Sequence, residues 1–580
     1  MAVNAALILV VGILIFIHVY YLRIKKIDRY VMKCDPSIRT PADRYNDGVE
    51  FFPTNKNVLF GFQFKSIAGL APVVGAIVAG LLWGWLPALI WILVGNIFIG
   101  WVQDYFSCMM SVRKDGKSLG PLSYELISPR TRNILLIFLL FYLILLMAAF
   151  SSLAAVMLSK NINYIIPTAT VLLAGVLVGL KMYRLKMDPI IATSAGIVLI
   201  VGGIWAGSLN MIPNPIGGRW VIDFPYFGTW GIQVPNIWLT VLLAICLVAA
   251  LTSIWKFTQP TIYMFFYVVL FGIIALAATL IFGNHVYLMP EYTEFFAGMS
   301  GTAAMPLWPL LFVTIACGSI SGWHSLVSSS ATSKQIDKET DVAPVTAGSM
   351  LAEGMLALLA LSIVATLSVA DTTDAHGNPL SAADIFSKGA ANLLGGSDTA
   401  NAYVGLIFVA LALAVMILIV RLGRLTIHEI GGEKIPLLRN KIIASVLFLA
   451  ATFFLASPNF GGTWIYIWVL FGGSNQLMAG LSLMIITLWL IDTKKGWMIS
   501  GIPGVFMIVT SIAALSYVSY QSLTRGFTSL LVSSETFDTP SGNIVAGIIG
   551  IILIIAAIIM CYDIFMAFKR RKDGINSGMS

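Results

Sequence analysis

Residues 133–157 read NILLIFLLFYLILLMAAFSSLAAVM, an apolar run of 25 residues without a charged side chain. A helix needs about 20 apolar residues to cross the hydrocarbon core of a bilayer. The run is therefore predicted to be a transmembrane helix. The same pattern recurs along the rest of the chain and decides its fold class.

The same criterion, applied to all 580 residues, predicts about fifteen spans. They are 5–22, 67–86, 87–110, 133–157, 163–180, 190–209, 236–256, 261–282, 306–330, 345–370, 401–420, 441–457, 464–490, 498–520 and 544–567. We therefore expect an all-α polytopic membrane protein.

The composition excludes soluble classes of protein. The chain is 58% hydrophobic and 11% charged, whereas a soluble chain is about 45–50% apolar and about 25% charged. The net charge of +8 does not indicate a nucleic-acid partner, because Lys and Arg lie mainly in short loops between spans. No phosphate-binding loop of the ATPase type occurs. We expect a small-molecule substrate and the lipid bilayer as partners, with no ATPase subunit and no enzyme activity.

The distribution of Lys and Arg predicts the orientation. Alternate gaps between spans, such as 23–66, 111–132 and 421–440, hold most of these residues. Positively charged loops stay in the cytoplasm. An odd number of spans with the N-terminus outside and the C-terminus inside follows, in the inner (plasma) membrane. The first span is expected to be retained, because no basic segment precedes it as in a signal peptide.

A break is predicted near the cytoplasmic start of the second span, where residues 69–75 read GLAPVVG. Pro72 removes a backbone donor, and irregular backbone survives in a membrane only where protein or a water-filled cavity satisfies it. Freed backbone groups at Gly69, Ala71, Pro72 and Gly75 are predicted to bind the substrate. The alternative is a proline kink packed through small residues.

A second polar segment is predicted in the ninth span, where residues 317–330 read CGSISGWHSLVSSS. Its serines follow helical spacing along one face. We expect Ser321 and Trp323 to contact the substrate, and Ser328 and Ser329 to hold a coupling cation. The alternative is that these hydroxyls bond to carbonyls of the preceding turn between packed helices.

The third candidate is FGGSNQ at residues 471–476 in the thirteenth span. The glycine pair followed by two amides predicts a kink with a polar lining, and Asn475 is a candidate substrate ligand. A structural hydrogen bond between helices is the alternative.

Three ionisable residues lie inside apolar spans: Asp104, His324 and Glu353. A charge at the bilayer centre costs about 2.5–3.5 kcal/mol, so such residues are usually functional or paired. Histidine titrates near neutral pH, and we predict that the three form a proton relay. The alternatives are that Asp104 pairs with an Arg or Lys of a loop and that His324 is a neutral core residue.

A metal site is a minor hypothesis. Cys108, Cys317 and His324 are suitable ligand types, but the sequence has no metal-ligand spacing. No cofactor is predicted with certainty besides a coupling H⁺ or Na⁺, and a transition metal is not excluded.

Several short strings occur in the order found in one known family. They are Arg39-Thr40-Pro41-Ala42, Asn46-Asp47-Gly48, Val58-Leu59-Phe60-Gly61, Ile67-Ala68-Gly69 with Pro72, Gln103-Asp104, Ser118-Leu119-Gly120, Thr314-Ile315-Ala316-Cys317-Gly318 and Met350-Leu351 with Glu353. The chain thereby resembles the carbon starvation protein A (CstA) family over residues 35–360. It departs from the family at Phe62-Gln63, where many members carry two histidines.

The resemblance implies uptake of short peptides, or of pyruvate with protons, during carbon starvation. Through related transporters it implies a LeuT-like core of inverted repeats, in which Gly69 and Pro72 face Ser328 and Ser329 across a sodium site. The expected parts are residues 1–66, an N-terminal helix with a cytoplasmic loop that carries the family signature; 67–420, the transporter core with helices broken at 69–75 and 317–330; and 421–580, peripheral helices.

The sequence therefore favours a secondary active transporter for short peptides or pyruvate, coupled to H⁺ or Na⁺. Two other classes stay open at this point. One is an uncoupled channel or solute sensor, and the other is a transmembrane metalloprotein or electron carrier.

Overall fold

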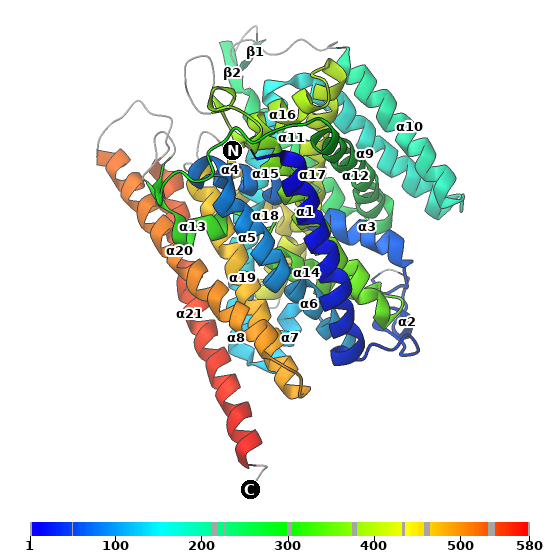
Figure 1. Ribbon diagram of the computed structural model, residues 1–580, viewed down its shortest axis with the longest axis vertical. Helices are drawn as coiled ribbons and strands as arrows, with labels where there is room; N and C mark the ends of the chain where they lie inside the picture. The colour runs from blue at the N-terminus through cyan, green and yellow to red at the C-terminus, as the bar shows by residue number, and fades with distance from the viewer. Residues whose placement is uncertain are drawn as a thin grey trace.

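The computed structural model describes residues 3–48, 50–209, 219–224, 228–298, 304–373, 380–431, 435–457, 464–531 and 540–577. In these ranges the chain is almost entirely helical, and the helices run mostly along the long axis of the molecule (Figure 1).

Eleven helices of the described residues are long and apolar enough to cross a membrane. They are built on α1 (Ala5–Val19), α5 with α6 (Trp85–Gly95 and Trp101–Arg113), α8 (Pro129–Lys160), α9 (Ile165–Gly179), α10 (Pro189–Ser208), α12 (Gln259–Phe282), α15 (Gly348–Ala365), α17 (Asp398–Gly431), α19 (Trp464–Asp492), α20 (Met498–Leu531) and α21 (Pro540–Ser577).

Four further segments are apolar but short or broken. Helices α3 (Lys56–Ile67) and α4 (Ala71–Trp83) meet at an angle of 44° and make a twelfth span if they are counted together. Helices α11 (Val234–Leu251) and α18 (Lys441–Ala456) are shorter. The predicted ninth span consists of two short helices, α13 (Leu307–Thr314) and α14 (Gly322–Ser330).

Each of the fifteen predicted spans overlaps one of these helices or broken pairs. The chain is thus a polytopic helical membrane protein, while the count of fifteen crossings stays a prediction. Two details differ from the expectation. The second span starts at Lys56, so its break lies inside the span rather than near its start. Helix α19 continues as an α-helix through Gly472 and Gly473, where a kink was expected.

Short elements connect the spans. The small helices are α2 (Pro41–Arg44), α7 (Leu119–Leu126) and α16 (Ala382–Leu393). Strand β1 (Arg219–Phe224) pairs antiparallel with β2 (Gly228–Gln233), and β3 (Phe296–Ala297) pairs antiparallel with β4 (Met305–Pro306). The π and 3-10 turns are Tyr20–Ile24, Ile27–Met32, Asn96–Gly100, Ile162–Tyr164, Leu180–Arg184, Ile254–Thr258, Thr332–Lys334, Glu339–Asp341, Ala343–Ala347, Val369–Thr372 and Pro436–Arg439.

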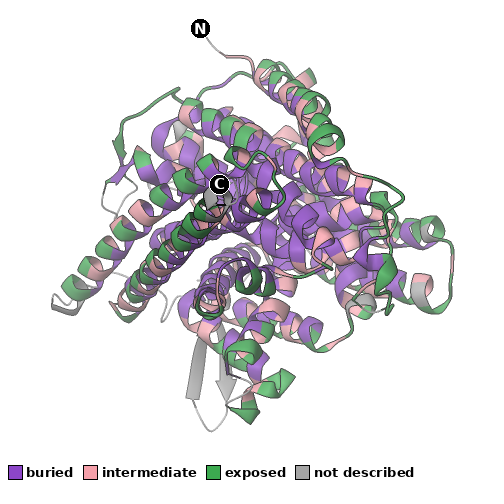
Figure 2. Cartoon of the chain, turned by 90° about the horizontal axis from the view of Figure 1, so that it is seen from below, coloured by how far each residue is buried: buried purple, intermediate pink, exposed green. Residues whose placement is uncertain are grey.

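The centre of the bundle is formed by α8, α15, α17 and α19, which are buried along most of their length. These helices are apolar on all sides, as expected of helices surrounded by others. Figure 2 shows the buried residues in the middle and the exposed ones on the outer helices. The outer helices expose large apolar side chains, for example Ile190 (75%) and Val198 (72%) on α10. Lipid, rather than water, is the solvent that suits such a surface.

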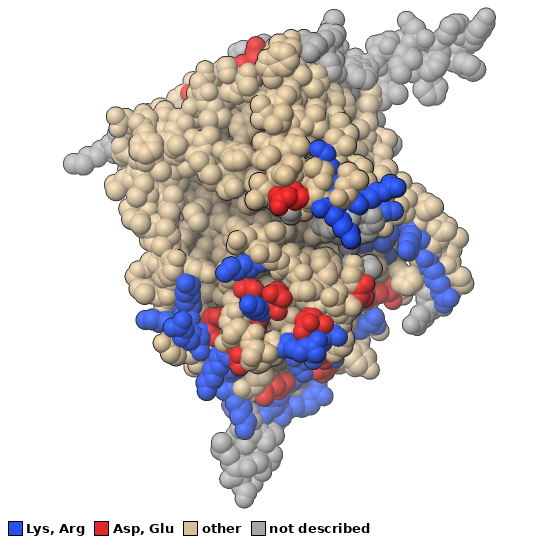
Figure 3. All heavy atoms as spheres, turned by 90° about the vertical axis from the view of Figure 1, so that its right-hand side faces the viewer, with Lys and Arg blue, Asp and Glu red and all other residues tan. Residues whose placement is uncertain are grey.

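Helix α1 starts toward one end of the molecule and α21 ends at the other (Figure 1). On the face drawn in Figure 3, Lys and Arg gather toward the end that carries the C-terminus, and much of the opposite end is free of charged side chains. This distribution agrees with the prediction that the C-terminus is cytoplasmic.

Candidate functional site

The first helix break lies between α3 and α4. Ala68 leaves the helical conformation (φ −69°, ψ 83°), and α4 starts again at Ala71. A helix that ends inside the protein leaves carbonyl groups without partners. Side chains satisfy two of them: Trp323 Nε1 donates to Ser66 O at 2.8 Å, and Lys65 Nζ donates to Ala68 O at 2.8 Å.

The second break separates α13 from α14 at residues 315–321. Side-chain amides from neighbouring helices satisfy its carbonyls. Asn96 Nδ2 donates to Gly318 O at 2.7 Å, and Gln103 Nε2 donates to Ser321 O at 2.6 Å. The break is therefore held open by polar residues that are distant from it in the sequence.

The two breaks touch each other. A Cβ atom at Gly318 would lie 3.3 Å from Cα of Pro72, and one at Gly75 would overlap the carbonyl oxygen of Thr314. Gly75 is thus required by the close approach of two backbones, and Gly318 chiefly by the Cβ atom of Ala357, which would lie 2.6 Å away. The predicted substrate residues Gly69, Ala71, Pro72 and Gly75 all lie along this contact or next to it.

Asn475 of α19 caps the start of α14. Its Oδ1 atom accepts hydrogen bonds from Trp323 N (3.1 Å), Ser321 Oγ (3.1 Å) and Tyr142 OH (2.8 Å). One turn earlier, a side chain at Gly472 would overlap the carbonyl of Val313. The α19 segment therefore forms the interhelical hydrogen bonds that were the alternative to a kink.

Three predicted residues from three elements meet beside the breaks. His324 lies in the first turn of α14, with Asp104 on α6 and Glu353 on α15. Nδ1 of His324 is 3.0 Å from Oδ2 of Asp104, and Nε2 is 3.0 Å from Oε2 of Glu353. All three side chains are fully buried. Asp104 thus pairs with His324 and not with a loop Arg or Lys.

This triad has unused hydrogen-bonding capacity. Oδ1 of Asp104 and both carboxylate oxygens of Glu353 have no hydrogen-bond partner among the described residues, and the contact to Nε2 of His324 is not aligned as a hydrogen bond. Lys65 on α3 also interacts electrostatically with Glu353. With both carboxylates ionised and Lys65 charged, the group carries a net charge of −1, which a proton on His324 cancels. Because buried net charge is costly, the site is suited to take up and release a proton.

The serines of α14 are bonded within the protein. Ser328 Oγ accepts from Gln63 Nε2 at 3.0 Å, and Ser329 Oγ donates to Ser325 O at 2.6 Å. The side of Gly69 on which a Cβ atom would lie is packed against Phe150 and Val415. These contacts do not bring Ser328 and Ser329 to Gly69, so the expected sodium site stays a prediction.

One group of atoms has the proximity that a metal ion needs. Cys317, His324 and Glu353 each offer a ligand atom, and these atoms lie within 4.8 Å of one another. Cys108 is fully buried on α6 but does not belong to this group. Sγ of Cys317 accepts a hydrogen bond from Asn475 Nδ2 at 3.3 Å. We do not assign these residues as metal ligands.

A cavity of about 370 Å³ lies between α3, α8, α14 and α17. At its surface end it is lined by the exposed Glu50 and Glu429, and at its inner end by the buried Trp323, the neighbour of His324. Lys334 and Arg421 also line it. By the positive-inside prediction the mouth faces the cytoplasm.

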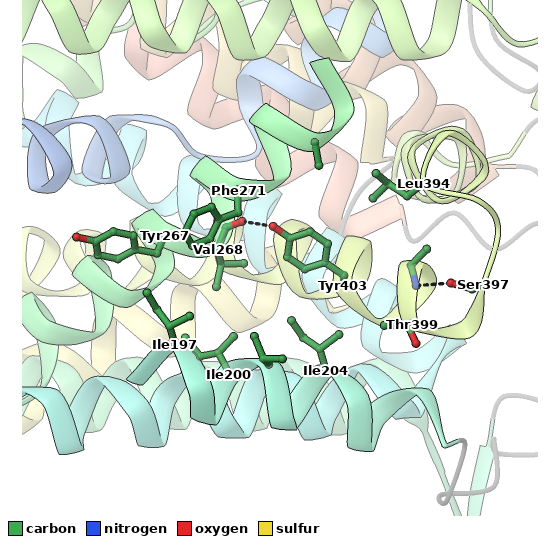
Figure 4. Close-up of a pocket in the computed structure, with 13 residues that line it drawn as sticks. Ile197, Ile200, Ile204, Tyr267, Val268, Phe271, Leu394, Ser397, Thr399 and Tyr403 are labelled. Atoms are coloured by element: carbon green, nitrogen blue, oxygen red, sulfur yellow. Dashed lines mark hydrogen bonds between the residues drawn. The ribbon is translucent and has the colours of Figure 1, made fainter. Parts of the chain in front are cut away.

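A second pocket has a different character. This pocket has a volume of about 470 Å³ and lies between α10, α12 and α17. Figure 4 shows Ile197, Ile200 and Ile204 pointing into it. Two tyrosines, Tyr267 and Tyr403, line it, and the hydroxyl of Tyr403 donates to the carbonyl of Val268 at 2.9 Å. With no charged lining, this pocket suits acyl chains of lipid rather than a hydrophilic solute.

Sequence reasoning missed the residues that support the breaks: Lys65, Asn96, Gln103 and Tyr142. The signal was present for the first three, because each is a strongly polar residue inside an apolar segment. Gln63 was noted only as a departure from the family. In the structure it joins α3 to Ser328 of α14 and to Thr332 in the 3-10 turn that follows α14.

Comparison with known proteins gives a match to a family model described as "Carbon starvation protein CstA" over residues 4–378 and 372–514. The chain is 27% identical to the protein named "Peptide transporter CstA" of Escherichia coli (strain K12), over 88% of this chain and 81% of that protein. It is 26% identical to "Pyruvate/proton symporter BtsT" of the same organism, with the same coverage. The "Peptide transporter CstA" of Bacillus subtilis (strain 168) is 28% identical, over 84% of this chain and 86% of that protein.

Among solved structures, a manganese transporter from Eremococcus coleocola aligns with 91% of this chain and 99% of its own, at 14% identity and a TM-score of 0.43. Agreement at this level does not assign the fold.

Proposed function

Because the chain belongs to the CstA family and is a multi-pass transporter of the inner membrane, we propose that it takes up pyruvate or a short peptide by secondary active transport coupled to protons. Relatives named as a peptide transporter and as a pyruvate/proton symporter support this choice. Both solutes carry a carboxylate, so one kind of site suits either of them.

The observation that carries the proposal is the buried triad of Asp104, His324 and Glu353 beside two broken helices. Protonatable residues at this depth are expensive to keep and usually serve a function. A broken helix exposes backbone groups that bind solutes or ions. A proton site next to a solute site is what coupling requires.

The substrate is proposed to bind where the breaks meet. Helices α4 and α14 both start there, and helix starts favour a carboxylate. Ser66 Oγ and Thr314 Oγ1 are buried near the breaks without hydrogen-bond partners among the described residues. Gly69, Ala71, Pro72, Gly75 and Trp323 are proposed to line this site. Ser321 and Asn475, which bond to each other, would have to exchange that bond for one to the solute.

The transport cycle then follows from the charges. A proton on His324 cancels the negative charge of the cluster, and a carboxylate solute adds a new one nearby. The solute is therefore bound best when the proton is present. The cavity that ends at Trp323 is the proposed route of release to the cytoplasm, where loss of the proton weakens binding.

We further propose a LeuT-like core of inverted repeats within residues 67–420, flanked by helices of 1–66 and 421–580, with fifteen crossings and the N-terminus outside. Two broken helices in contact, the second and the ninth in order, support this arrangement. A role in the response to carbon starvation is proposed from the family alone. It predicts higher expression when the carbon source runs out.

The test is uptake of labelled pyruvate and of a labelled dipeptide into proteoliposomes under imposed proton or sodium gradients. We expect accumulation of one solute with an inward proton gradient, and its loss in His324→Gln. Accumulation that is driven only by a sodium gradient would show that Na⁺, and not H⁺, is the coupling ion. Flux that ignores both gradients would refute coupling and favour a channel.

A further inference from the structure

The position of Lys65 is unusual for a lysine. It is one of the largest fully buried side chains of the protein, and it lies in the last turn of α3, directly before the first break. Lysine is almost never fully buried unless it is paired. Its partners therefore indicate what it does.

Lys65 has two kinds of partner. Its ammonium donates to Ala68 O at 2.8 Å, a carbonyl that the break has released from the helix. Its charged neighbour is Glu353, the carboxylate of the triad whose two oxygens have no hydrogen-bond partner. Oxygen atoms from an unwound backbone together with a nearby carboxylate are the ligands that a Na⁺ ion would take at such a break. Here the ammonium of Lys65 already contacts the released carbonyl of Ala68, and it attracts the carboxylate of Glu353 electrostatically.

The neighbouring groups leave little room for a second cation. Ser66 O, the other released carbonyl, accepts from Trp323, and Ser328 Oγ accepts from Gln63. A Na⁺ ion at the break would lie beside the ammonium of Lys65, and two like charges at close range repel strongly where the dielectric is low. The ammonium of Lys65, which is part of the chain itself, thus serves as the cation of this break.

We propose that Lys65 replaces a bound Na⁺ ion: its ammonium supplies the positive charge that the broken backbone and Glu353 require, and transport by this chain is therefore independent of Na⁺. This rests on the proposed transport function, of which it fixes the ion specificity. It identifies Lys65 as a positioning residue that holds the break and compensates Glu353, not as a ligand of the solute.

The experiment compares purified wild type, Lys65→Met, Lys65→Arg and the double variant Lys65→Met/Glu353→Gln. Lys56→Ala serves as the control, because Lys56 is exposed at the start of the same helix. Thermal unfolding in detergent is measured in sodium chloride and in choline chloride, and uptake driven by a proton gradient is measured in both salts.

Wild type and Lys56→Ala are expected to give the same melting temperature and uptake in both salts. Lys65→Met should melt lower and lose proton-driven uptake by about tenfold or more, because it leaves Glu353 uncompensated. The double variant should regain most of the lost melting temperature, since removing both charges is milder than removing one. Lys65→Arg, which keeps the charge, should melt above Lys65→Met.

The proposal is overturned if wild type is stabilised or activated saturably by Na⁺, or if Lys65→Met transports like wild type. It is also overturned if the double variant loses the sum of the two single losses, because the two charges would then be uncoupled. The melting experiments need no substrate. If wild type accumulates neither solute, the proposed function fails while these experiments still decide the role of Lys65.

Discussion

Replacing Asp104 by Asn tests the triad most directly. The change removes one charge and keeps the shape. In the structure Oδ2 of Asp104 lies 3.0 Å from Nδ1 of His324, and both side chains are fully buried. At an effective dielectric constant of about 20, a charge pair at this distance has a gross attraction of about 5.5 kcal/mol.

The net effect is smaller than the gross attraction, because burial of each charge is itself costly. Breaking one partner of a buried pair costs about 3–5 kcal/mol. Asn retains an acceptor for the imidazole, so the lower end, about 3 kcal/mol, is the better value for the loss of the protonated state. That corresponds to a decrease of about 10²-fold in the population that carries the proton.

The assay is accumulation of the solute in proteoliposomes under an inward proton gradient, alongside exchange of labelled for unlabelled solute at equal pH. We expect Asp104→Asn to lower accumulation by about 10²-fold and to leave exchange within about threefold. The matched control is Asp43→Asn, whose partner Arg39 lies 2.5 Å away but with 69% and 46% of the two side chains exposed. Exposed pairs are worth about 0–1 kcal/mol, so this variant should behave as wild type.

Two results would refute the reasoning. One is normal accumulation by Asp104→Asn. The other is an equal loss of accumulation and exchange in protein that is folded and monodisperse, which would assign Asp104 to solute binding or to the fold rather than to coupling.

Three further outcomes are expected. Gly472→Ala should lower the free energy of unfolding by about 2 kcal/mol or more, and with it the melting temperature, because its Cβ would overlap the carbonyl of Val313. The control is Gly202→Ala on the exposed face of α10, where a Cβ meets nothing within 4 Å, and this change should be neutral or stabilising. The hydroxyl of Ser368 and the ammonium of Lys388 lower the pKa of Asp371 to about 2. Asp371→Asn should therefore lower the melting temperature by the same amount from pH 8 to 5, and its difference from wild type should vanish as the pH falls from about 4 toward 2. A difference that grows in acid would contradict this. Glu339→Gln removes the negative charge that pairs with Arg113 (2.6 Å) and leaves one acceptor oxygen where Arg113 and Asp35 N (3.2 Å) now use two. It should speed maleimide labelling of Cys34 by about fivefold; an unchanged rate would show that this ion pair does not restrain the segment.

Much of the fold could be predicted because the membrane requires long apolar segments, which are visible one by one. Every predicted span overlaps a helix or a broken pair. The triad could be predicted for the same reason: Asp104, His324 and Glu353 stand out as charges in apolar surroundings. What the sequence could not give is that one imidazole contacts both carboxylates, because that depends on how α6, α14 and α15 pack.

The break before α14 was harder to place. Cys317 and Ser321 have helical spacing with Ser325, and the same spacing would occur in an unbroken helix. The helix ends there because side-chain amides of Asn96 and Gln103 satisfy the released carbonyls from across the bundle. The role of Lys65 was missed for a related reason. Its significance comes from Ala68 and Glu353, and the second is 288 positions away in a chain read by local pattern.

The contact between the two breaks also bears on how the molecule moves. At Gly75 the main chain of α4 rests on the main chain of Thr314 and Ile315 with no side chain between them, so no layer of methyl groups lies there along which one segment could slide past the other. Close-packed surfaces of this kind rearrange as blocks and do not deform continuously. In the proposed transport cycle the start of α4 and the segment between α13 and α14 are therefore expected to move together. The hinges of that motion then belong at the far ends of these helices, where Gly84 has a positive φ of 89° after α4 and Ala331 ends α14.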